Sequence, residues 1–187
     1  MKLALKVDVG TLRGVRTGVP RLIELLKKHN ANASFFFNLG PDRVLFPGAE
    51  VGRRYAETLR QTRAAGFEVG IHAYNSRLWK NKAAGADAVW TLNQMQLACE
   101  RFDEIFKDAP RIHGAPGWQM SLHAFRLTQR LGFDYGSDTR GICPFVPIFR
   151  GEIIACPQLP TTLPTLDEAI AGAGTKGAAD HLLKLSE

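Results

Sequence analysis

The sequence predicts an α/β fold, and more specifically a distorted, incomplete (β/α) barrel of about six parallel strands. Short apolar runs alternate with amphipathic stretches along the chain, which is typical of successive βα units and a parallel sheet. The 187 residues are fewer than a closed eight-stranded barrel usually needs, and an open parallel sheet is the alternative. This length suits one domain with its own core, so we expect a single domain over residues 1–187.

The first half of the chain contains three expected strands and two expected helices. Residues 3–9 form an apolar run typical of a strand, and residues 19–29 follow with apolar residues at helical spacing and a basic last turn. A second strand is expected at 33–39, around three consecutive phenylalanines. Residues 49–65 indicate a helix that a glycine ends, and residues 67–72 form the third apolar strand.

The next part of the chain repeats this alternation with shorter strands. Residues 88–107 predict a long helix that ends shortly before a proline, and residues 111–115 a short fourth strand. A helix over 122–131 stops at a glycine, and the fifth strand is expected at 133–137.

The last part of the chain holds a sixth expected strand at 152–156 and a helix at 178–185. Between them, residues 159–165 contain two prolines and are expected to be rigid and non-helical. Thr165 has the pattern of a helix N-cap, with Glu168 at the capping-box position.

Composition and charge exclude several classes of protein. Hydrophobic residues make up 45% and charged residues 22%, which excludes a disordered or low-complexity chain. Cys99, Cys143 and Cys156 lack C-x-x-C spacing, which excludes a disulfide scaffold and suits a reducing compartment. No apolar run reaches the roughly 18 residues of a membrane span, and the charged N-terminus does not have the pattern of a signal peptide. The net charge of +6 allows an anionic partner; the alternative is a solvated basic surface.

Polar side chains at the ends of the expected strands are the candidates for chemistry, because sites in such folds form at the carboxyl ends of parallel strands. Asp8 lies at the end of the first strand and His72 at the end of the third. Together they could hold a divalent metal, or Asp8 could act as a general base toward water. The alternatives are that Asp8 caps the next turn and that His72 is a packed structural residue.

Further candidates lie on or after the fourth and fifth strands. Asp138 and Arg140 could orient a catalytic carboxylate or grip a substrate phosphate, or they form an ordinary exposed ion pair. Trp118 offers a flat apolar face that suits a sugar, or it anchors a turn as a buried residue. His113, on the fourth strand, is a weaker candidate for the same site.

Segments along nearly the whole chain resemble one known family. They are KVDV at 6–9, RGVRTGVPRL at 13–22, ASFFFNLGPD at 33–42, EVGIHA at 68–73, GW at 117–118, YGSDTRG at 135–141 and LPTTLPT at 159–165. In these segments the chain resembles the NodB-type polysaccharide deacetylases, and most closely the branch that deformylates 4-deoxy-4-formamido-L-arabinose-phosphoundecaprenol in lipid A modification. The resemblance implies a distorted (β/α) barrel and a metal-dependent amidohydrolase that uses a divalent ion, commonly zinc.

The resemblance also implies roles for the residues at the first and third strands. Asp8 matches the general base, and His72 matches one of three metal ligands. Gly10 and Ser76 stand where the other two ligands are usual, and neither is a good ligand for zinc. Asn75 stands where this branch usually carries an aspartate.

The remaining matched positions concern the support of the base and the binding of substrate. Asp138 and Arg140 match the motif that sets the base and binds substrate, and we list them with Asp8 as catalytic candidates. The residues expected to bind substrate are Trp118, Asn75 and Arg13. The family's last strand carries a histidine general acid; we expect that strand to be missing, because no residue before Glu187 matches the acid.

The resemblance predicts a hydrolase that removes an N-formyl or N-acetyl group from an amino sugar, in the manner of the lipid-linked aminoarabinose pathway. We expect impaired activity and weak zinc binding, because Gly10 and Ser76 replace two usual ligands. The alternative is a catalytically inactive homologue that binds a sugar-phosphate lipid. The expected substrate is an amino sugar or an undecaprenyl-phosphate sugar, with no nucleic-acid partner. We expect a cytoplasmic protein with peripheral contact to the inner membrane, and a homodimer that covers an exposed sheet edge.

Overall fold

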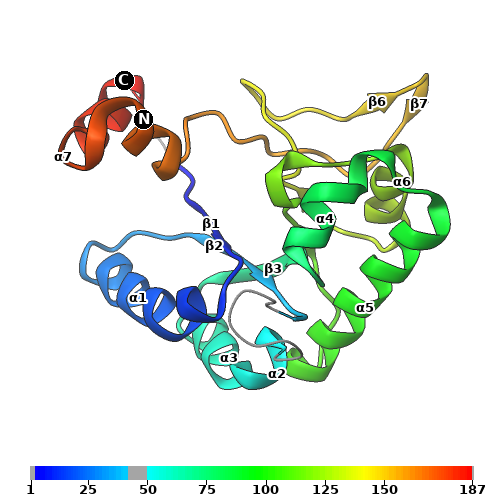
Figure 1. Ribbon diagram of the computed structural model, residues 1–187, viewed down its shortest axis with the longest axis horizontal. Helices are drawn as coiled ribbons and strands as arrows, with labels where there is room; N and C mark the ends of the chain where they lie inside the picture. Colours follow the sequence, from blue (N-terminus) through cyan, green and yellow to red (C-terminus); the bar gives the residue numbers. More distant parts are fainter. Residues whose placement is uncertain (1–2, 42–49, 187) are drawn as a thin grey trace.

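The computed structural model describes residues 3–41 and 50–186, and a parallel five-stranded sheet lies at its centre (Figure 1). The strands lie in chain order, and each pairs in parallel with the next: β1 (Lys6–Val9), β2 (Ser34–Asn38), β3 (Glu68–Ala73), β4 (Ile112–His113) and β5 (Tyr135–Gly136). The α/β class and the first five predicted strands are therefore confirmed. Strands β1, β2, β4 and β5 are shorter than expected, whereas β3 has the predicted length and is shifted by one residue.

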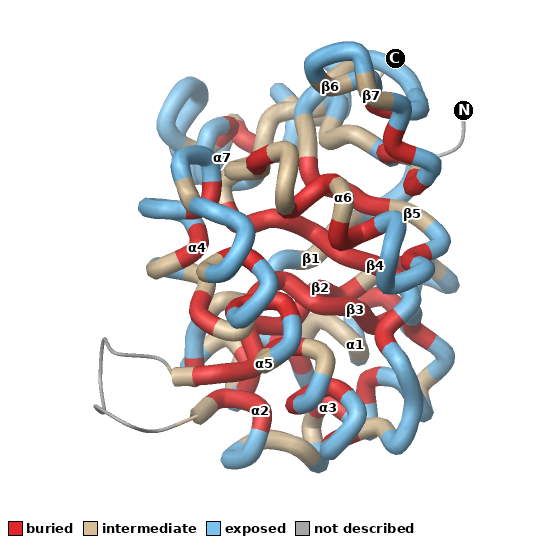
Figure 2. The backbone as a smooth tube through the Cα atoms, turned by 90° about the vertical axis from the view of Figure 1, so that its right-hand side faces the viewer, coloured by how far each residue is buried: buried red, intermediate tan, exposed pale blue. Residues whose placement is uncertain are grey.

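Helices connect the strands and cover one face of the sheet. Those described are α1 (Val19–Lys28), α2 (Val51–Arg54), α3 (Ala56–Ala64), α4 (Ser76–Lys82), α5 (Ala88–Phe106), α6 (Leu122–Arg130) and α7 (Leu166–Ser186), with short turns at Gly14–Gly18, Ala83–Gly85 and Pro116–Trp118. Helices α1, α3, α5 and α6 pack against one another in succession, and α3 and α5 contact β3. In Figure 2 the strands form a buried layer beside these helices. No helix in the described part of the chain is long and apolar enough to span a membrane.

The two faces of the sheet differ because side chains alternate along a strand. Phe35, Phe37 and Ile71 belong to the apolar core shared with the helices. Phe36 points to the other face, where its ring lies 5.4 Å from the Lys6 ammonium. This second face is tightly packed: a Cβ added to Gly114 would lie 2.9 Å from the Phe36 ring.

Lys6 shows that the sheet is curved like part of a barrel. Its Nζ on β1 donates to the carbonyl oxygen of Ser137, just after β5, at 3.0 Å. In a flat sheet four strand spacings would separate these strands by about 19 Å, which is beyond the reach of a lysine side chain. Among the residues described, no strand pairs with the outer edge of β1, so this partial barrel stays open there.

The predicted sixth parallel strand at 152–156 is wrong. Residues Glu152–Ile153 (β7) pair in antiparallel fashion with Ile148–Phe149 (β6). The two residues between them, Arg150 and Gly151, have φ of 52° and 81°, which is the left-handed pair that closes a tight hairpin. Gln158 and Thr161 instead run beside the fifth strand, in parallel bridges to Gly136 and Arg140.

Other differences concern the helices. The helix predicted at 49–65 is divided at Tyr55, where φ is −121°, and residue 49 lies outside the described residues. Helix α7 begins well before the predicted 178 and is interrupted at Gly174 (φ 71°). The predicted capping box is confirmed: Thr165 N donates to Glu168 Oε2 at 2.8 Å, and Glu168 N donates to Thr165 Oγ1 at 3.3 Å.

Candidate functional site

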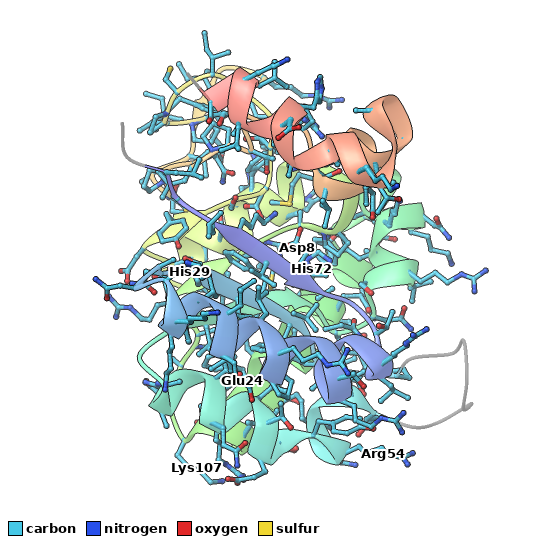
Figure 3. The ribbon with its side chains drawn as sticks, turned by 90° about the vertical axis from the view of Figure 1, so that its left-hand side faces the viewer. Asp8, Glu24, His29, Arg54, His72 and Lys107 are labelled. Carbon is cyan, nitrogen blue, oxygen red and sulfur yellow. The ribbon has the colours of Figure 1, made fainter. Side chains whose placement is uncertain are left out.

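Asp8 and His72 come together at the carboxyl ends of β1 and β3, as the strand-end argument predicts (Figure 3). Asp8 Oδ1 lies 3.8 Å from His72 Nδ1. Asp8 Oδ2 lies 3.2 Å from the Lys6 ammonium, a contact that the sequence reasoning missed. Lys6 is two residues before Asp8 and therefore on the same face of the strand, which is the signal that could have identified it. The result is a carboxylate that faces a histidine on one side and a cation on the other.

The His72 ring is fixed by the backbone of the neighbouring strand. Its Nδ1–H donates to the Gly114 carbonyl at 2.7 Å, so Nδ1 carries the proton and the lone pair lies on Nε2. The pKa of His72 is lowered to about 4, chiefly by burial; the nearby Asp8 carboxylate opposes this shift and the Lys6 ammonium adds to it. The ring is therefore neutral at physiological pH. A carbonyl on one nitrogen and a free lone pair on the other is how metal-binding histidines are usually held.

The two positions that lack metal-binding side chains also lie here. A Cβ built on Gly10 would lie 3.5 Å from Ser76 Oγ, so the loop after β1 meets the start of α4. Ser76 N donates to Asn38 Oδ1 at 2.7 Å, which ties this turn to the end of β2. Asn75, expected to bind substrate, uses its side-chain oxygen to cap α4 by accepting from Leu78 N at 2.9 Å.

These residues do not fit a catalytic zinc site. Such a site usually takes three protein ligands, whereas Asp8 and His72 are the two suitable side chains that meet here among the residues described. Within residues 3–41 and 50–186 no group of three or more His, Cys, Asp and Glu side chains is placed to hold a metal ion. The Lys6 ammonium beside Asp8 also supplies positive charge at the carboxylate.

Asp138 bonds to His113, whose ring packs against Trp79 and Phe133 of the apolar core, and none of its described hydrogen bonds goes to Asp8. Its carboxylate is fully buried and accepts from His113 Nδ1 at 2.6 Å, from Ala115 N at 2.9 Å and from Gln158 Nε2 at 3.1 Å. The Gln158 side-chain oxygen accepts from Asp138 N at 3.0 Å. His113 and Gln158 were not expected as partners of Asp138, because they come from segments far apart in the sequence.

The Asp138 network reaches His72 through the fourth strand. His113 and Ala115, which both bond to Asp138 Oδ1, flank Gly114 in the chain. The Gly114 carbonyl in turn accepts from His72 Nδ1. Asp138 thus holds the strand segment that orients His72, although none of its described hydrogen bonds goes to Asp8.

Trp118 and Arg140 form a second group at the same end of the sheet. The Arg140 guanidinium lies over the Trp118 ring, 4.1 Å from its centre, and pairs with Glu168 rather than with Asp138. Trp118 Nε1 donates to Thr161 Oγ1 at 3.1 Å, and its half-exposed side chain fits neither a fully buried anchor nor a free surface residue. Arg13, also expected to bind substrate, is exposed before the first helical turn.

Comparisons with known proteins agree with this geometry. Residues 2–136 match the sequence family described as polysaccharide deacetylase. A protein of Shewanella sediminis named as a 4-deoxy-4-formamido-L-arabinose-phosphoundecaprenol deformylase is 29% identical over 214 residues, covering 96% of this chain and 68% of the relative.

Two solved structures show the same fold. One is a polysaccharide deacetylase structure from Mycobacterium smegmatis, with a TM-score of 0.69 and 23% identity, and the match covers 85% of this chain. The chain spans 58% of that protein's length. The other is a CE4 family pseudoenzyme from Bacillus anthracis, with a TM-score of 0.56 and 18% identity, covering 71% of this chain and 41% of that one.

Proposed function

The chain belongs to the polysaccharide deacetylase family, and on that premise we propose that it binds the N-formyl or N-acetyl group of an amino sugar at Asp8 and His72 and hydrolyses that amide only weakly. The convergence of Asp8, Gly10, His72 and Ser76 at the adjoining carboxyl ends of β1 and β3 carries this proposal. In the reaction a water adds to the carbonyl carbon while a base takes one of its protons; that proton then passes to the nitrogen as the C–N bond breaks, which releases the free amine and formate or acetate. Asp8, half-exposed and held by Lys6, is the side chain placed to act as that base.

Weak activity follows from the ligand positions. Gly10 has no side chain and Ser76 offers a hydroxyl, so the metal-assisted route generally used by the family lacks its usual ligands. Each 1.36 kcal/mol of lost transition-state stabilisation costs about a factor of ten in rate. A second candidate function is a catalytically inactive homologue that binds a sugar-phosphate lipid. The Arg140 guanidinium stacked on Trp118 favours this candidate, because it offers a cation beside an aromatic face.

The named relative supports a lipid-linked substrate. Its name refers to a formamido-arabinose carried on phosphoundecaprenol. We extend to this chain an amino-sugar or undecaprenyl-phosphate-sugar substrate, a cytoplasmic location with peripheral contact to the inner membrane, and a role in lipid A modification. We also propose that residues 1–187 are one domain, supported by a single apolar core cluster, and that the chain forms a homodimer.

The test restores the two absent ligands. A Cβ at Gly10 meets only ordinary contact distances, so the Gly10→Asp plus Ser76→His double variant should fold. We expect calorimetric titration, with a chelated-zinc control, to give tight one-to-one zinc binding in the double variant and at most weak binding in the natural chain. Amide hydrolysis of an N-formyl amino sugar should rise together with zinc binding.

A size-matched control separates ligand chemistry from a change of shape. The Gly10→Asn plus Ser76→Gln variant introduces side chains of similar size that are poor zinc ligands. It should gain neither zinc nor activity. Tight zinc binding by the natural chain would contradict the assigned ligand set. A double variant that binds zinc without hydrolysis would favour the binding-only homologue.

A further inference from the structure

We propose that Arg140 and Trp118 form an anion subsite for the phosphate ester of a sugar-phosphate ligand, and that Glu168 at the start of α7 covers this subsite as an internal competitor. The sugar part of the ligand rests on the proposed function. The phosphate part rests on contacts among residues 118, 140, 161 and 168.

Arg140 is held in a geometry that suits an anion. Its guanidinium stacks 4.1 Å from the centre of the Trp118 ring, which fixes the plane of the group and directs its N–H edge away from the ring, toward an anionic partner. The Trp118 ring is itself held by its Nε1 bond to Thr161. Gly117 and Trp118 both have positive φ (61° and 55°), so the backbone is bent to place this ring.

Glu168 is the group that occupies the Arg140 N–H edge. Its Oε2 pairs with Arg140 and also accepts from Thr165 N in the capping box. The side chains of Arg140 and Glu168 are 39% and 50% exposed, and such exposed pairs contribute little to stability. A phosphate ester carries more negative charge and more acceptor oxygens than this carboxylate, so it can displace Glu168. When Glu168 is displaced, the capping box loses its bond from Thr165 N. Its other bond, from Glu168 N to Thr165 Oγ1, remains as long as the first turn of α7 stays folded.

The subsite lies at the same edge of the sheet as the amide-binding residues, at the carboxyl ends of neighbouring strands. Trp118 and Arg140 follow β4 and β5, and Asp8 and His72 lie at the ends of β1 and β3. The Lys6 ammonium contacts both the Asp8 carboxylate, at 3.2 Å, and the carbonyl oxygen of Ser137, at 3.0 Å, so Asp8 lies near the segment after β5 that leads to Arg140. We therefore expect one ligand with an acylated amine and a phosphate to contact both groups.

The experiment follows the indole N–H signals of the three tryptophans by NMR, with Trp118→Phe to assign the signal of Trp118. The probes are glucose 1-phosphate, decyl phosphate and glucose. Either phosphate ester should shift the Trp118 signal, and glucose should not. Glucose 1-phosphate binding indicates a sugar phosphate as the source of the anion, whereas binding of decyl phosphate alone indicates a lipid headgroup.

Three variants give the subsite its specific test. Arg140→Gln should weaken phosphate-ester binding by about tenfold or more, and Glu168→Gln should tighten it about two- to fivefold. Asp134→Asn is the matched control: it makes the same charge change at another exposed arginine pair, with Arg111, at the amino ends of β4 and β5. It should leave the affinity unchanged.

Two results would overturn the proposal. If Arg140→Gln binds the phosphate esters as tightly as the natural chain does, Arg140 is not part of a phosphate subsite. If Glu168→Gln and Asp134→Asn tighten binding equally, the gain comes from the change in net charge and not from the release of Arg140. The probes carry no acyl amide and the variants leave Asp8 and His72 intact. A failure here is therefore distinct from a failure of the proposed amide hydrolysis.

Discussion

Asp138 illustrates how a buried carboxylate can act on a site that it does not touch. One of its carboxylate oxygens holds both the His113 ring on β4 and the Ala115 amide just after β4. Gly114 between them has no side chain because Phe36 and Lys6 fill the space on its other side. Its carbonyl position, and with it the orientation of His72, therefore depends on Asp138. We infer that Asp138 is a positioning residue.

Replacing Asp138 with asparagine should destabilise the fold. The new amide group would face Gln158 Nε2, donor against donor, and reorienting Gln158 would break its bond from Asp138 N. An unmade buried hydrogen bond costs about 1–3 kcal/mol, and urea unfolding should show a loss of that order. Asp134→Asn, which breaks an exposed pair, should cost less than about 1 kcal/mol.

Zinc affinity is a second measurement, and it separates a role of Asp138 in orienting His72 from a role in the stability of the fold. In the Gly10→Asp plus Ser76→His background, Asp138→Asn should lower zinc affinity under conditions where the protein is fully folded, because His72 loses its fixed orientation. Unchanged zinc affinity would contradict the positioning role while leaving the structural one.

Among the elements, α7 contains three glycines, and two of them, Gly172 and Gly174, have contrasting backbone conformations. Gly172 is helical, whereas Gly174 has φ 71° and ψ 165°, and an added Cβ meets nothing within 4 Å at either position. Gly172→Ala should stabilise α7 by about 0.5–1 kcal/mol, because alanine is the better helix former. Gly174→Ala should destabilise it by about 1–3 kcal/mol, because that region of φ and ψ is essentially restricted to glycine.

Hydrogen exchange of the α7 amides measures both effects directly. Protection should rise in Gly172→Ala and fall in Gly174→Ala. Equal changes in the two variants would mean that α7 runs as one continuous helix through residue 174, against the break in the backbone.

The elements also show what the sequence could predict. Helix signals with a local cause, such as the Thr165–Glu168 capping box, appear as expected because both partners lie within one turn. The strand at 152–156 was misassigned because an apolar run does not reveal its partner, and the Arg150–Gly151 turn decides for a hairpin. A left-handed arginine is not recognisable from residue type alone.

The candidate site likewise has a part that the sequence could predict and a part that it could not. The meeting of Asp8 and His72 follows from strand ends on one edge of a parallel sheet, which periodicity can locate. The alternation of side chains fixes their direction only within a strand, so it does not predict where a side chain points in the loop that follows. Asp138 and Arg140 lie in such a loop: Asp138 bonds to His113 and Gln158, and Arg140 bonds to Glu168. These pairings arise from tertiary packing between distant segments.

For the molecule as a whole, the notable feature is the outer edge of β1, whose backbone groups have no partner strand among the residues described. In the described part of the chain no strand covers that edge, and Leu3 and Leu5 beside it are 57% and 38% exposed. An uncovered strand edge with apolar neighbours is a template for pairing with another chain. The net charge of +6 opposes association only weakly at physiological salt, because the Debye length is about 8 Å.

We therefore expect a homodimer that pairs along β1, and size-exclusion chromatography with light scattering over a concentration series should show twice the monomer mass. Leu5→Lys should shift the equilibrium to monomer, because it places a charge at the paired edge. Leu131→Lys makes the same change at a similarly exposed leucine, 40% against 38%, after α6 and away from β1, and should leave the dimer intact. A natural chain that is monomeric at every concentration would show that the edge is protected by its own short length and by the neighbouring Lys6 charge.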